Sequence, residues 1–303
     1  MAQQEHRLKQ DSGQTAPFGP EHRPEPCFEH RSKELLVTTV HKSTPVLEER
    51  ARALAAELGA DFVPREGKSA ERLTREAGDN GLLIVEKNNL TLYQGEETFF
   101  FHPNMAVLRI QALKKGQRDP LVHALDIRSG DRILDCTLGL GADALVAAFA
   151  AGDEGAVTGI EHNRLIALIV REGLQHFRHR RSDDLHRAMA RIRVLQGDHR
   201  ALLKGFSNGS FDSVYFDPMF RQALRASNGI GGLRQLADPR PIEADVIAEA
   251  RRVARRRVVM KERRDSPEWE RLAPEHVECG KYAPVAYGIW SGGGEVLGGE
   301  RYT

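Results

Sequence analysis

The sequence predicts an α/β protein in which a doubly wound, seven-stranded sheet follows a smaller amino-terminal α/β domain. Three observations predict this class. From residue 119 onward, apolar strands alternate with helices that carry apolar residues at helical spacing. Residues 132–151 form strand, glycine turn and helix in succession, the first half of a βαβ unit. Four strands end in an acidic residue, which places carboxylates along one edge of the sheet.

The composition is ordinary for a globular protein and indicates no particular partner. The 303 residues can hold one large α/β domain and a smaller one; 40% are hydrophobic and 29% charged, with a net charge of +1. The three cysteines are widely spaced without a C-x-x-C pair, so we expect neither a disulfide framework nor a metal site. We find no apolar signal-peptide core and no run of membrane-spanning length, and therefore expect a cytoplasmic protein without a membrane partner.

The amino-terminal part divides into an extension and a small domain. Residues 1–32 are polar and contain four prolines; such a segment cannot bury enough apolar area to offset its ordering entropy, so we predict a disordered extension. Residues 33–95 predict a small α/β domain with no glycine-rich phosphate loop, which suggests an accessory or substrate-binding role. Its expected elements are a strand at 35–40, a helix at 45–58 between Thr44 and Gly59, a helix at 69–77, and a hairpin of strands 81–86 and 89–93.

Residues 96–118 predict a linker followed by a helix. Three consecutive aromatics, Phe99 to Phe101, precede His-Pro-Asn, and the helix begins at Met105 and ends near Lys114. A buried strand and linker closing over the next domain is the favoured interpretation, since apolar runs are usually core. An aromatic wall beside a base-binding pocket is the alternative.

The glycine turn is the first sign of a cofactor. Asp135 ends a strand, Gly139 and Gly141 let the backbone turn and a ligand approach, and Glu161 ends the next strand 20 residues beyond Gly141. At that distance a carboxylate accepts hydrogen bonds from two ribose hydroxyls. The pattern Gly139-x-Gly141-x-x-Ala144 fits a nicotinamide dinucleotide, but Asp135 would repel its pyrophosphate and suits the amine and sulfonium cations of S-adenosylmethionine. A structural turn with a solvated aspartate is the third interpretation.

The large domain, expected over residues 119–292, continues the alternation. Helices are predicted at 163–177 and 241–254, a loop and short helix between 178 and 193, strands at 156–161, 192–198, 211–217, 257–261, 276–281 and 284–291, and a flexible tail at 293–303. Asp135, Glu161, Asp198 and Asp217 then lie along the edge where doubly wound folds bind ligands. Asp198, after the third strand, suits a hydrogen bond to an adenine amino group.

Asp217-Pro-Met-Phe220 is the most specific signal after the glycine turn. An exocyclic base amine is a poor nucleophile because its lone pair is delocalised into the ring. The Asp217 side chain and the Pro218 carbonyl oxygen can accept the two hydrogens of such an amine and turn its lone pair toward an electrophilic methyl group. Phe220 can stack on the base. A plain turn after the strand is the alternative for so short a motif.

Five segments carry a family resemblance: Phe100-Phe-His-Pro-Asn104, Leu134-Asp-Cys-Thr-Leu-Gly-Leu-Gly-Ala-Asp143, Gly159-Ile-Glu-His-Asn-Arg164, Gly197-Asp-His199 and Val214-Tyr-Phe-Asp-Pro-Met-Phe220. Through them the chain, over roughly residues 33–290, resembles class I S-adenosylmethionine-dependent methyltransferases, in detail the small-subunit ribosomal RNA methyltransferase J family and a related bacterial group.

The resemblance implies a Rossmann-like methyltransferase fold, S-adenosylmethionine as cofactor, and methylation of a guanine 2-amino group in 16S RNA. By position it places cofactor contacts on Ala142, Asp143, Glu161, His162, Asp198, His199 and Asp217. Met219 and Phe220 depart from the common Asp-Pro-Pro-Tyr motif, although Asp-Pro-Met occurs within the family.

Two basic stretches, Arg251 to Arg264 and Arg178 to Arg193, are candidate RNA contacts; a solvated helix face explains them equally well. Together the observations predict an S-adenosylmethionine-dependent N-methyltransferase whose partner is RNA, with small-subunit ribosomal RNA as the expected substrate. A nicotinamide-dependent oxidoreductase and a non-catalytic RNA-binding module on the same fold are the alternatives, and the oligomeric state is left open.

Overall fold

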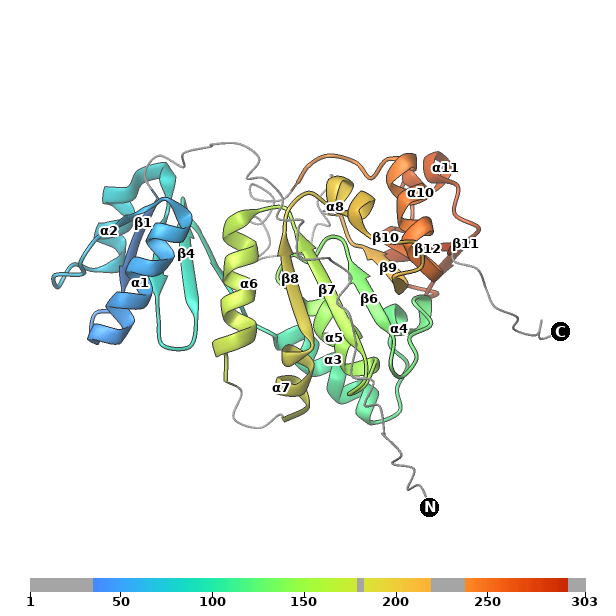
Figure 1. Cartoon of the computed structure of the whole chain (residues 1–303), viewed down its shortest axis with the longest axis horizontal. Coiled ribbons are helices and arrows are strands. Elements are labelled where there is room, and N and C mark those ends of the chain that lie inside the picture. Colours follow the sequence, from blue (N-terminus) through green and yellow to red (C-terminus); the bar gives the residue numbers. More distant parts are fainter. Residues whose placement is uncertain (1–34, 179–182, 219–237, 294–303) are drawn as a thin grey trace, which may run out of the picture.

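A computed structural model describes residues 35–178, 183–218 and 238–293 of the chain. These residues form two sheets, with helix α6 (Arg164–His176) between them (Figure 1). The predicted extension at 1–32 and the motif residues Met219 and Phe220 lie outside the described residues, as does the tail from 294 to 303.

The smaller sheet contains five strands in the order β2-β1-β3-β4-β5. β1 is parallel to β2 and β3, whereas β3, β4 and β5 are antiparallel, so the predicted hairpin is confirmed. β5 carries this sheet past residue 95, where we expected the small domain to end. The elements are β1 (Leu36–Thr39), α1 (Pro45–Leu58), β2 (Asp61–Phe62), α2 (Ala70–Ala77), the short 3₁₀ helix η1 (Gly78–Asn80), β3 (Leu82–Val85), β4 (Leu90–Gln94) and β5 (Glu97–Phe100).

Helix α1 begins and ends where the sequence predicts. The Thr44 hydroxyl accepts a hydrogen bond from the amide of Leu47 at 3.3 Å, which satisfies one of the free donors of the first turn. Gly59 adopts a left-handed conformation with φ of 64°, which ends the helix at little steric cost. The buried face of α1, which includes Leu54 and Leu58, packs on β1.

The larger sheet has the predicted seven strands, in the order β11-β12-β10-β9-β6-β7-β8. β6 to β10 are parallel to one another, whereas β12 is antiparallel to both β10 and β11. The strands are β6 (Arg132–Asp135), β7 (Ala156–Glu161), β8 (Ile192–Gln196), β9 (Phe211–Phe216), β10 (Ala254–Arg263), β11 (His276–Cys279) and β12 (Val285–Ser291). The helices are α3 (Asn104–Lys114), α4 (Pro120–Ala124), α5 (Ala142–Ala150), α7 (Asp183–Ala190), α8 (His199–Gly205), α10 (Ala244–Val253) and α11 (Glu268–Leu272). In the part of the chain that is described, no helix is both long and apolar enough to cross a bilayer.

Successive residues of the central strands pack into layers on opposite faces of the sheet, as the pleat requires. Leu134 and Val214 join a buried cluster with α8 and α10. Ile133 joins a cluster with α5, and Tyr215 joins one with α4. Because full burial of each such aliphatic side chain contributes about 1.5–3 kcal/mol, helices are held on both faces of the sheet. The predicted doubly wound arrangement is therefore confirmed.

The two sheets share a core because α6 packs on both of them. Phe101, directly after β5, is fully buried, and a Cβ atom on Gly173 of α6 would lie 2.2 Å from its ring. Glycine therefore lets Phe101 lie against the helix backbone. Phe99 is also buried, whereas Phe100 is 40% exposed. The favoured interpretation of the aromatic run, a buried strand and linker, holds for two of its three residues.

The winding of the large sheet reverses between β6 and β9. β7 and β8 extend the sheet on one side of β6, and β9 and β10 extend it on the other. In doubly wound folds, ligands bind in the crevice at the carboxyl ends of the two strands at such a switch point. Asp135 ends β6 and Asp217 directly follows β9, so the fold brings these two carboxylates to the switch point.

Candidate functional site

The turn between β6 and α5 is held against β7. Gly139 and Gly141 have positive φ angles of 51° and 79°, which favour glycine, and the amide of Leu138 donates to the carbonyl oxygen of Ile160 at 2.9 Å. A Cβ atom on Gly159 would lie 2.5 Å from the Leu138 side chain, so glycine lets the turn approach the strand. A Cβ atom on Gly139 would meet no atom closer than 3.9 Å, so this side of the turn has room for a ligand.

Glu161, at the end of β7, supports the same turn. Its Oε2 accepts the amide hydrogen of Gly139 at 3.0 Å, and its Oε1 accepts that of Asn163 at 2.7 Å. Burial raises the pKa of the Glu161 carboxyl, although these two amide hydrogen bonds oppose the rise. The structure thus brings Glu161 to the glycine turn, while its contact with a ribose stays a prediction.

Thr137 links the ends of β6 and β9. Its amide donates to Asp135 Oδ1 at 3.0 Å, and its hydroxyl accepts the amide hydrogen of Asp217 at 2.5 Å. Burial raises the pKa of Asp135 well above its ordinary value, and the nearby charges of Asp143 and Asp217 raise it further. Within the described residues no basic side chain forms an ion pair with Asp135, so a negative charge there would be uncompensated.

Lys261, from β10, bridges the carboxylates of Asp217 and Asp143. Its Nζ lies 2.7 Å from Asp217 Oδ2 and 3.4 Å from Asp143 Oδ2. Burial, together with repulsion from Asp143, raises the pKa of Asp217 to about 6 even though Lys261 opposes the rise. Burial disfavours the Lys261 ammonium, but the two carboxylates outweigh it and raise its pKa. At neutral pH, Asp217 is therefore an ionised acceptor paired with a cation.

Asp143, in the first turn of α5, is bound by three partners. Its Oδ1 pairs with Arg109 of α3, and its Oδ2 accepts the hydroxyl hydrogen of Tyr215 at 2.8 Å and faces Lys261. Arg109 also forms a two-pronged ion pair with Asp119, with N–O distances of 2.7 and 2.9 Å. Although burial opposes it, Lys261 and Arg109 lower the pKa of Asp143 to about 2. Asp143 is thus a charged anchor for the two basic side chains.

Asp198, at the start of α8, is already engaged by basic side chains. Its Oδ1 accepts the backbone amide hydrogen of Arg200 at 2.9 Å and lies 3.3 Å from the Arg200 guanidinium, and its Oδ2 pairs with Arg240 at 2.9 Å. Asp238 pairs with the same two arginines, at 3.0 and 2.7 Å. The predicted adenine contact of the Asp198 carboxylate would therefore compete with two arginines, and it stays a prediction.

The two histidines assigned by the resemblance have different surroundings. His162 is exposed, and its carbonyl oxygen accepts a hydrogen bond from Gln196 Nε2 at 3.2 Å. His199 is 5% exposed, and burial lowers the pKa of its imidazole to about 4, so the ring is neutral at pH 7. Among the described residues the Nε2 atom of His199 has no hydrogen-bond partner. Such a buried polar atom normally requires a partner, for example a water molecule or a ligand.

The basic stretch from Arg251 to Arg264 is directed toward protein groups. Arg256 forms an ion pair with Asp131, and Lys261 belongs to the carboxylate network. For these two residues the predicted phosphate contacts are therefore corrected, because their charged groups contact carboxylates of the protein. β10 lies inside the sheet, so its long basic side chains reach groups on neighbouring elements.

Four residues of the site were not assigned to it from the sequence: Arg109, Thr137, Tyr215 and Lys261. Thr137 and Tyr215 stand beside Asp135 and Asp217 in the two motifs, so their positions were a usable signal. Arg109 lies in α3, far from either motif in sequence, and no spacing pattern points to it.

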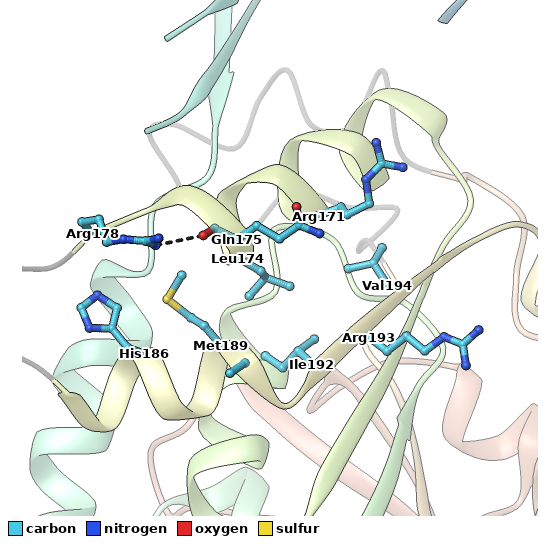
Figure 2. Close-up of a pocket in the computed structure, with 10 residues that line it drawn as sticks. Arg171, Leu174, Gln175, Arg178, His186, Met189, Ile192, Arg193 and Val194 are labelled. Carbon is cyan, nitrogen blue, oxygen red and sulfur yellow. Dashed lines mark hydrogen bonds between the residues drawn. The ribbon is translucent and has the colours of Figure 1, made fainter. Parts of the chain in front are cut away.

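A cavity of about 770 Å³ lies between α6, α7 and β8, and not at the carboxylate edge (Figure 2). Leu174, Met189 and Ile192 line it, and the Arg178 guanidinium at its rim donates to the carbonyl oxygen of Gln175 at 2.9 Å. Ile192 is the first residue of β8, whereas doubly wound folds bind ligands at the carboxyl ends of their strands. We therefore place the candidate site at the carboxylates.

The chain is similar to known methyltransferases along most of its length. Residues 68–283 match a family described as "Putative SAM-dependent methyltransferase", where SAM is S-adenosylmethionine. The uncharacterized protein YpiP of Bacillus subtilis is 40% identical over 84% of this chain and 98% of its own length. The ribosomal RNA small subunit methyltransferase J of Ectopseudomonas mendocina is 33% identical over 77% of this chain and 86% of its own length. A crystal structure of a SAM-dependent methyltransferase from Neisseria gonorrhoeae, 21% identical, has a TM-score of 0.57 over 88% of this chain and 100% of that protein, which shows a shared fold.

Proposed function

The chain belongs to the S-adenosylmethionine-dependent methyltransferase family, and from this premise we propose that it methylates guanine N2 in small-subunit ribosomal RNA. The observation that carries the proposal is the Asp217-Pro218 pair at the tip of β9, beside the glycine turn and ion-paired with Lys261. The relative from Ectopseudomonas mendocina, named as a ribosomal RNA small subunit methyltransferase, supports this choice of substrate. The family uses S-adenosylmethionine, so the nicotinamide alternative is set aside. A ribosomal substrate implies a cytoplasmic location, which is part of the proposal.

The residues at the switch point fit this cofactor. When bound, S-adenosylmethionine supplies an electrophilic methyl group on a sulfonium centre. Asp135 is a buried carboxylate that pairs with no cation in the described part of the chain, and a cationic ligand would compensate its charge. The turn at Gly139 has room for a ligand, and the buried Nε2 atom of His199 lacks a partner among the residues described.

The proposed cofactor contacts follow from these positions. Glu161 accepts hydrogen bonds from the ribose hydroxyls beside the glycine turn, and Asp135 faces the cationic end of the methionine moiety. Asp198 and His199 adjoin the adenine. Asp143 anchors Lys261 and Arg109 in addition to bordering the cofactor. The remaining residues of the proposed contact surface are Gly139, Gly141, Ala142 and His162.

Asp217 and Pro218 orient the substrate amine. The Asp217 carboxylate accepts one amine hydrogen and the Pro218 carbonyl oxygen accepts the other, so that the nitrogen lone pair turns toward the electrophilic carbon. As the N–C bond forms and the C–S bond breaks, the nitrogen must lose a proton, and Asp217 is the carboxylate in contact with it. A pKa of about 6 suits this role, because Asp217 is ionised at neutral pH and still basic enough to take up a proton. Phe220 stacks on the base in this proposal.

The nucleoside composition of ribosomal RNA tests the substrate assignment. RNA from a strain that lacks the protein should lose an N2-methylguanosine from the small subunit, and purified protein with S-adenosylmethionine should restore it. Loss of a different methylated nucleoside would overturn the substrate assignment. If no nucleoside changes and the protein still binds RNA, the non-catalytic RNA-binding module becomes the better interpretation.

Asp217→Asn tests the mechanism. The substitution keeps the shape of the side chain but places an amide donor opposite an amine donor. We expect single-turnover methyl transfer to fall by about two orders of magnitude, a barrier increase of about 3 kcal/mol. Cofactor affinity, measured by titration calorimetry, should change much less. A wild-type rate in the folded variant would contradict amine orientation and point to an oxygen or carbon target.

A further inference from the structure

Within the described part of the chain, Lys261 is the basic group in direct contact with Asp217, and the sequence placed it only in a stretch of candidate RNA contacts. It reaches Asp217 because β10 pairs in parallel with β9, with Met260 opposite Phe216, so the next residue of each strand lies at the same edge of the sheet. The side chain of Lys261 is 23% exposed, so a large part of its charge is shielded from water.

The ammonium group of Lys261 is held by two carboxylates. Asp217 Oδ2 lies 2.7 Å from Nζ, and Asp143 Oδ2 lies 3.4 Å from it. Asp143 is itself held by Arg109 and by the hydroxyl of Tyr215. A chain of contacts therefore runs from α3 through α5 to β10 and fixes the carboxylate that follows β9. The hydrogen bond from Lys261 is made to Oδ2 of Asp217, not to Oδ1.

We propose that Lys261 is a positioning residue for methyl transfer: its ammonium group holds the Asp217 carboxylate as an ion-paired acceptor and directs Oδ1 toward the substrate amine. This inference rests on the proposed function of Asp217. Lys261 acts on the reaction by positioning Asp217 and does not contact the substrate.

The charges around Asp217 explain why this cation matters. Among the described residues, the groups that face the Asp217–Lys261 pair are Asp135 at the end of β6, Asp143 on α5, Tyr215 on β9, Tyr287 on β12 and, beyond Asp143, Arg109 on α3. Asp143 is ionised at neutral pH and disfavours a second negative charge beside it. Without Lys261, burial and Asp143 would raise the pKa of Asp217 above its present value of about 6. A protonated Asp217 donates a hydrogen bond where the amine requires an acceptor.

Lys261→Met is the informative substitution, because methionine retains an unbranched side chain and removes the charge. We expect the acid limb of the single-turnover pH–rate profile to move to higher pH. Below both pKa values, each unit of displacement lowers the ionised fraction of Asp217, and with it the rate, about tenfold. The rate should recover as the pH rises and Asp217 ionises, whereas a merely structural defect would lower the rate at every pH. Lys204→Met, at an exposed lysine of α8, is the matched control and should leave the profile unchanged.

Direct titration of Asp217 separates this inference from the proposed function. Carboxyl-carbon NMR of protein with labelled aspartate, assigned with Asp217→Asn, should show a higher pKa of Asp217 in Lys261→Met than in the wild type. If the wild type methylates no RNA but this shift is observed, the proposed function fails while the control of Asp217 by Lys261 stands. If the Asp217 titration and the acid limb both coincide with the wild type, the inference is overturned.

Lys261→Arg keeps the inference testable if the methionine variant does not fold. Arginine retains the charge but presents a larger, planar group to the carboxylate. The acid limb should therefore stay at the wild-type pH while the plateau rate falls, because Asp217 stays ionised but is displaced. A displaced acid limb, or an unchanged plateau rate, would contradict the positioning role.

Discussion

Replacing Glu161 by glutamine should weaken cofactor binding without unfolding the protein. The carboxylate accepts two backbone amide hydrogens, from Gly139 at 3.0 Å and from Asn163 at 2.7 Å. Glutamine keeps the size of the side chain but has one oxygen, so its NH2 group must face one of the two amide donors. The turn then loses one charge-assisted hydrogen bond and gains a donor–donor contact.

The size of the effect follows from the charge that is removed. Hydrogen bonds to a charged group contribute about 1.5–3 kcal/mol, and the ribose hydroxyls lose the same charged acceptor as the turn does. We therefore expect the dissociation constant of the cofactor to rise about ten- to a hundredfold. Protonation should mimic the substitution. Because burial raises the pKa of Glu161 above its ordinary 4.5, the wild-type affinity should fall as the pH is lowered toward that raised pKa.

Titration calorimetry with S-adenosylhomocysteine, between about pH 5 and pH 8, measures both effects. The affinity of Glu161→Gln should be lower at neutral pH and should lack the part of the pH dependence that comes from Glu161. Glu96→Gln, in the exposed turn between β4 and β5, is the matched control and should bind like the wild type. An unchanged affinity in folded Glu161→Gln would remove Glu161 from the cofactor site.

Three further predictions concern packing, titration and base stacking. Gly173→Ala would place a Cβ atom 2.2 Å from the ring of Phe101, so overpacking should lower the unfolding free energy by about 1–3 kcal/mol. An unaltered melting temperature would contradict this, because it would show that the Phe101 ring moves aside without an energetic cost. The imidazole of His199 has a pKa of about 4 in the folded protein and an ordinary pKa of 6.5, which we take for the unfolded chain. Its contribution to the unfolding free energy is therefore complete above pH 6.5 and is lost as the pH falls toward 4. In denaturant titrations, the unfolding free energy of the wild type should be about 2 kcal/mol lower at pH 5 than at neutral pH, and His199→Phe should lack this decrease. The same pH dependence of the unfolding free energy in both proteins would refute this prediction. Phe220→Ala should weaken RNA binding by about 1–3 kcal/mol in a filter-binding assay, and wild-type affinity would exclude stacking.

Local sequence patterns determined the elements of the fold and the acids at their ends. Asp135, Glu161 and Asp217 each stand at the end of a predicted strand, and the structure has strands ending at or directly before these residues. This worked because buried parallel strands appear as short apolar runs between helices, and because consecutive parallel strands present their carboxyl ends at one edge. The position of the candidate site therefore follows from secondary structure and connectivity, without knowledge of side-chain contacts.

Only the tertiary structure decided which charges meet at that edge. Arg109 precedes its partner Asp143 by 34 residues, and Lys261 follows Asp217 by 44, separations over which no helical or strand period carries information. In the sequence, Lys261 belongs to a basic run that is equally typical of an RNA contact or a solvated face. Its partner was settled by strand order, because β10 lies next to β9 and brings Lys261 beside Asp217 in a buried site. Burial there makes an unpaired carboxylate unfavourable, so the pairing of charges depends on the packed fold and not on the composition of the segment.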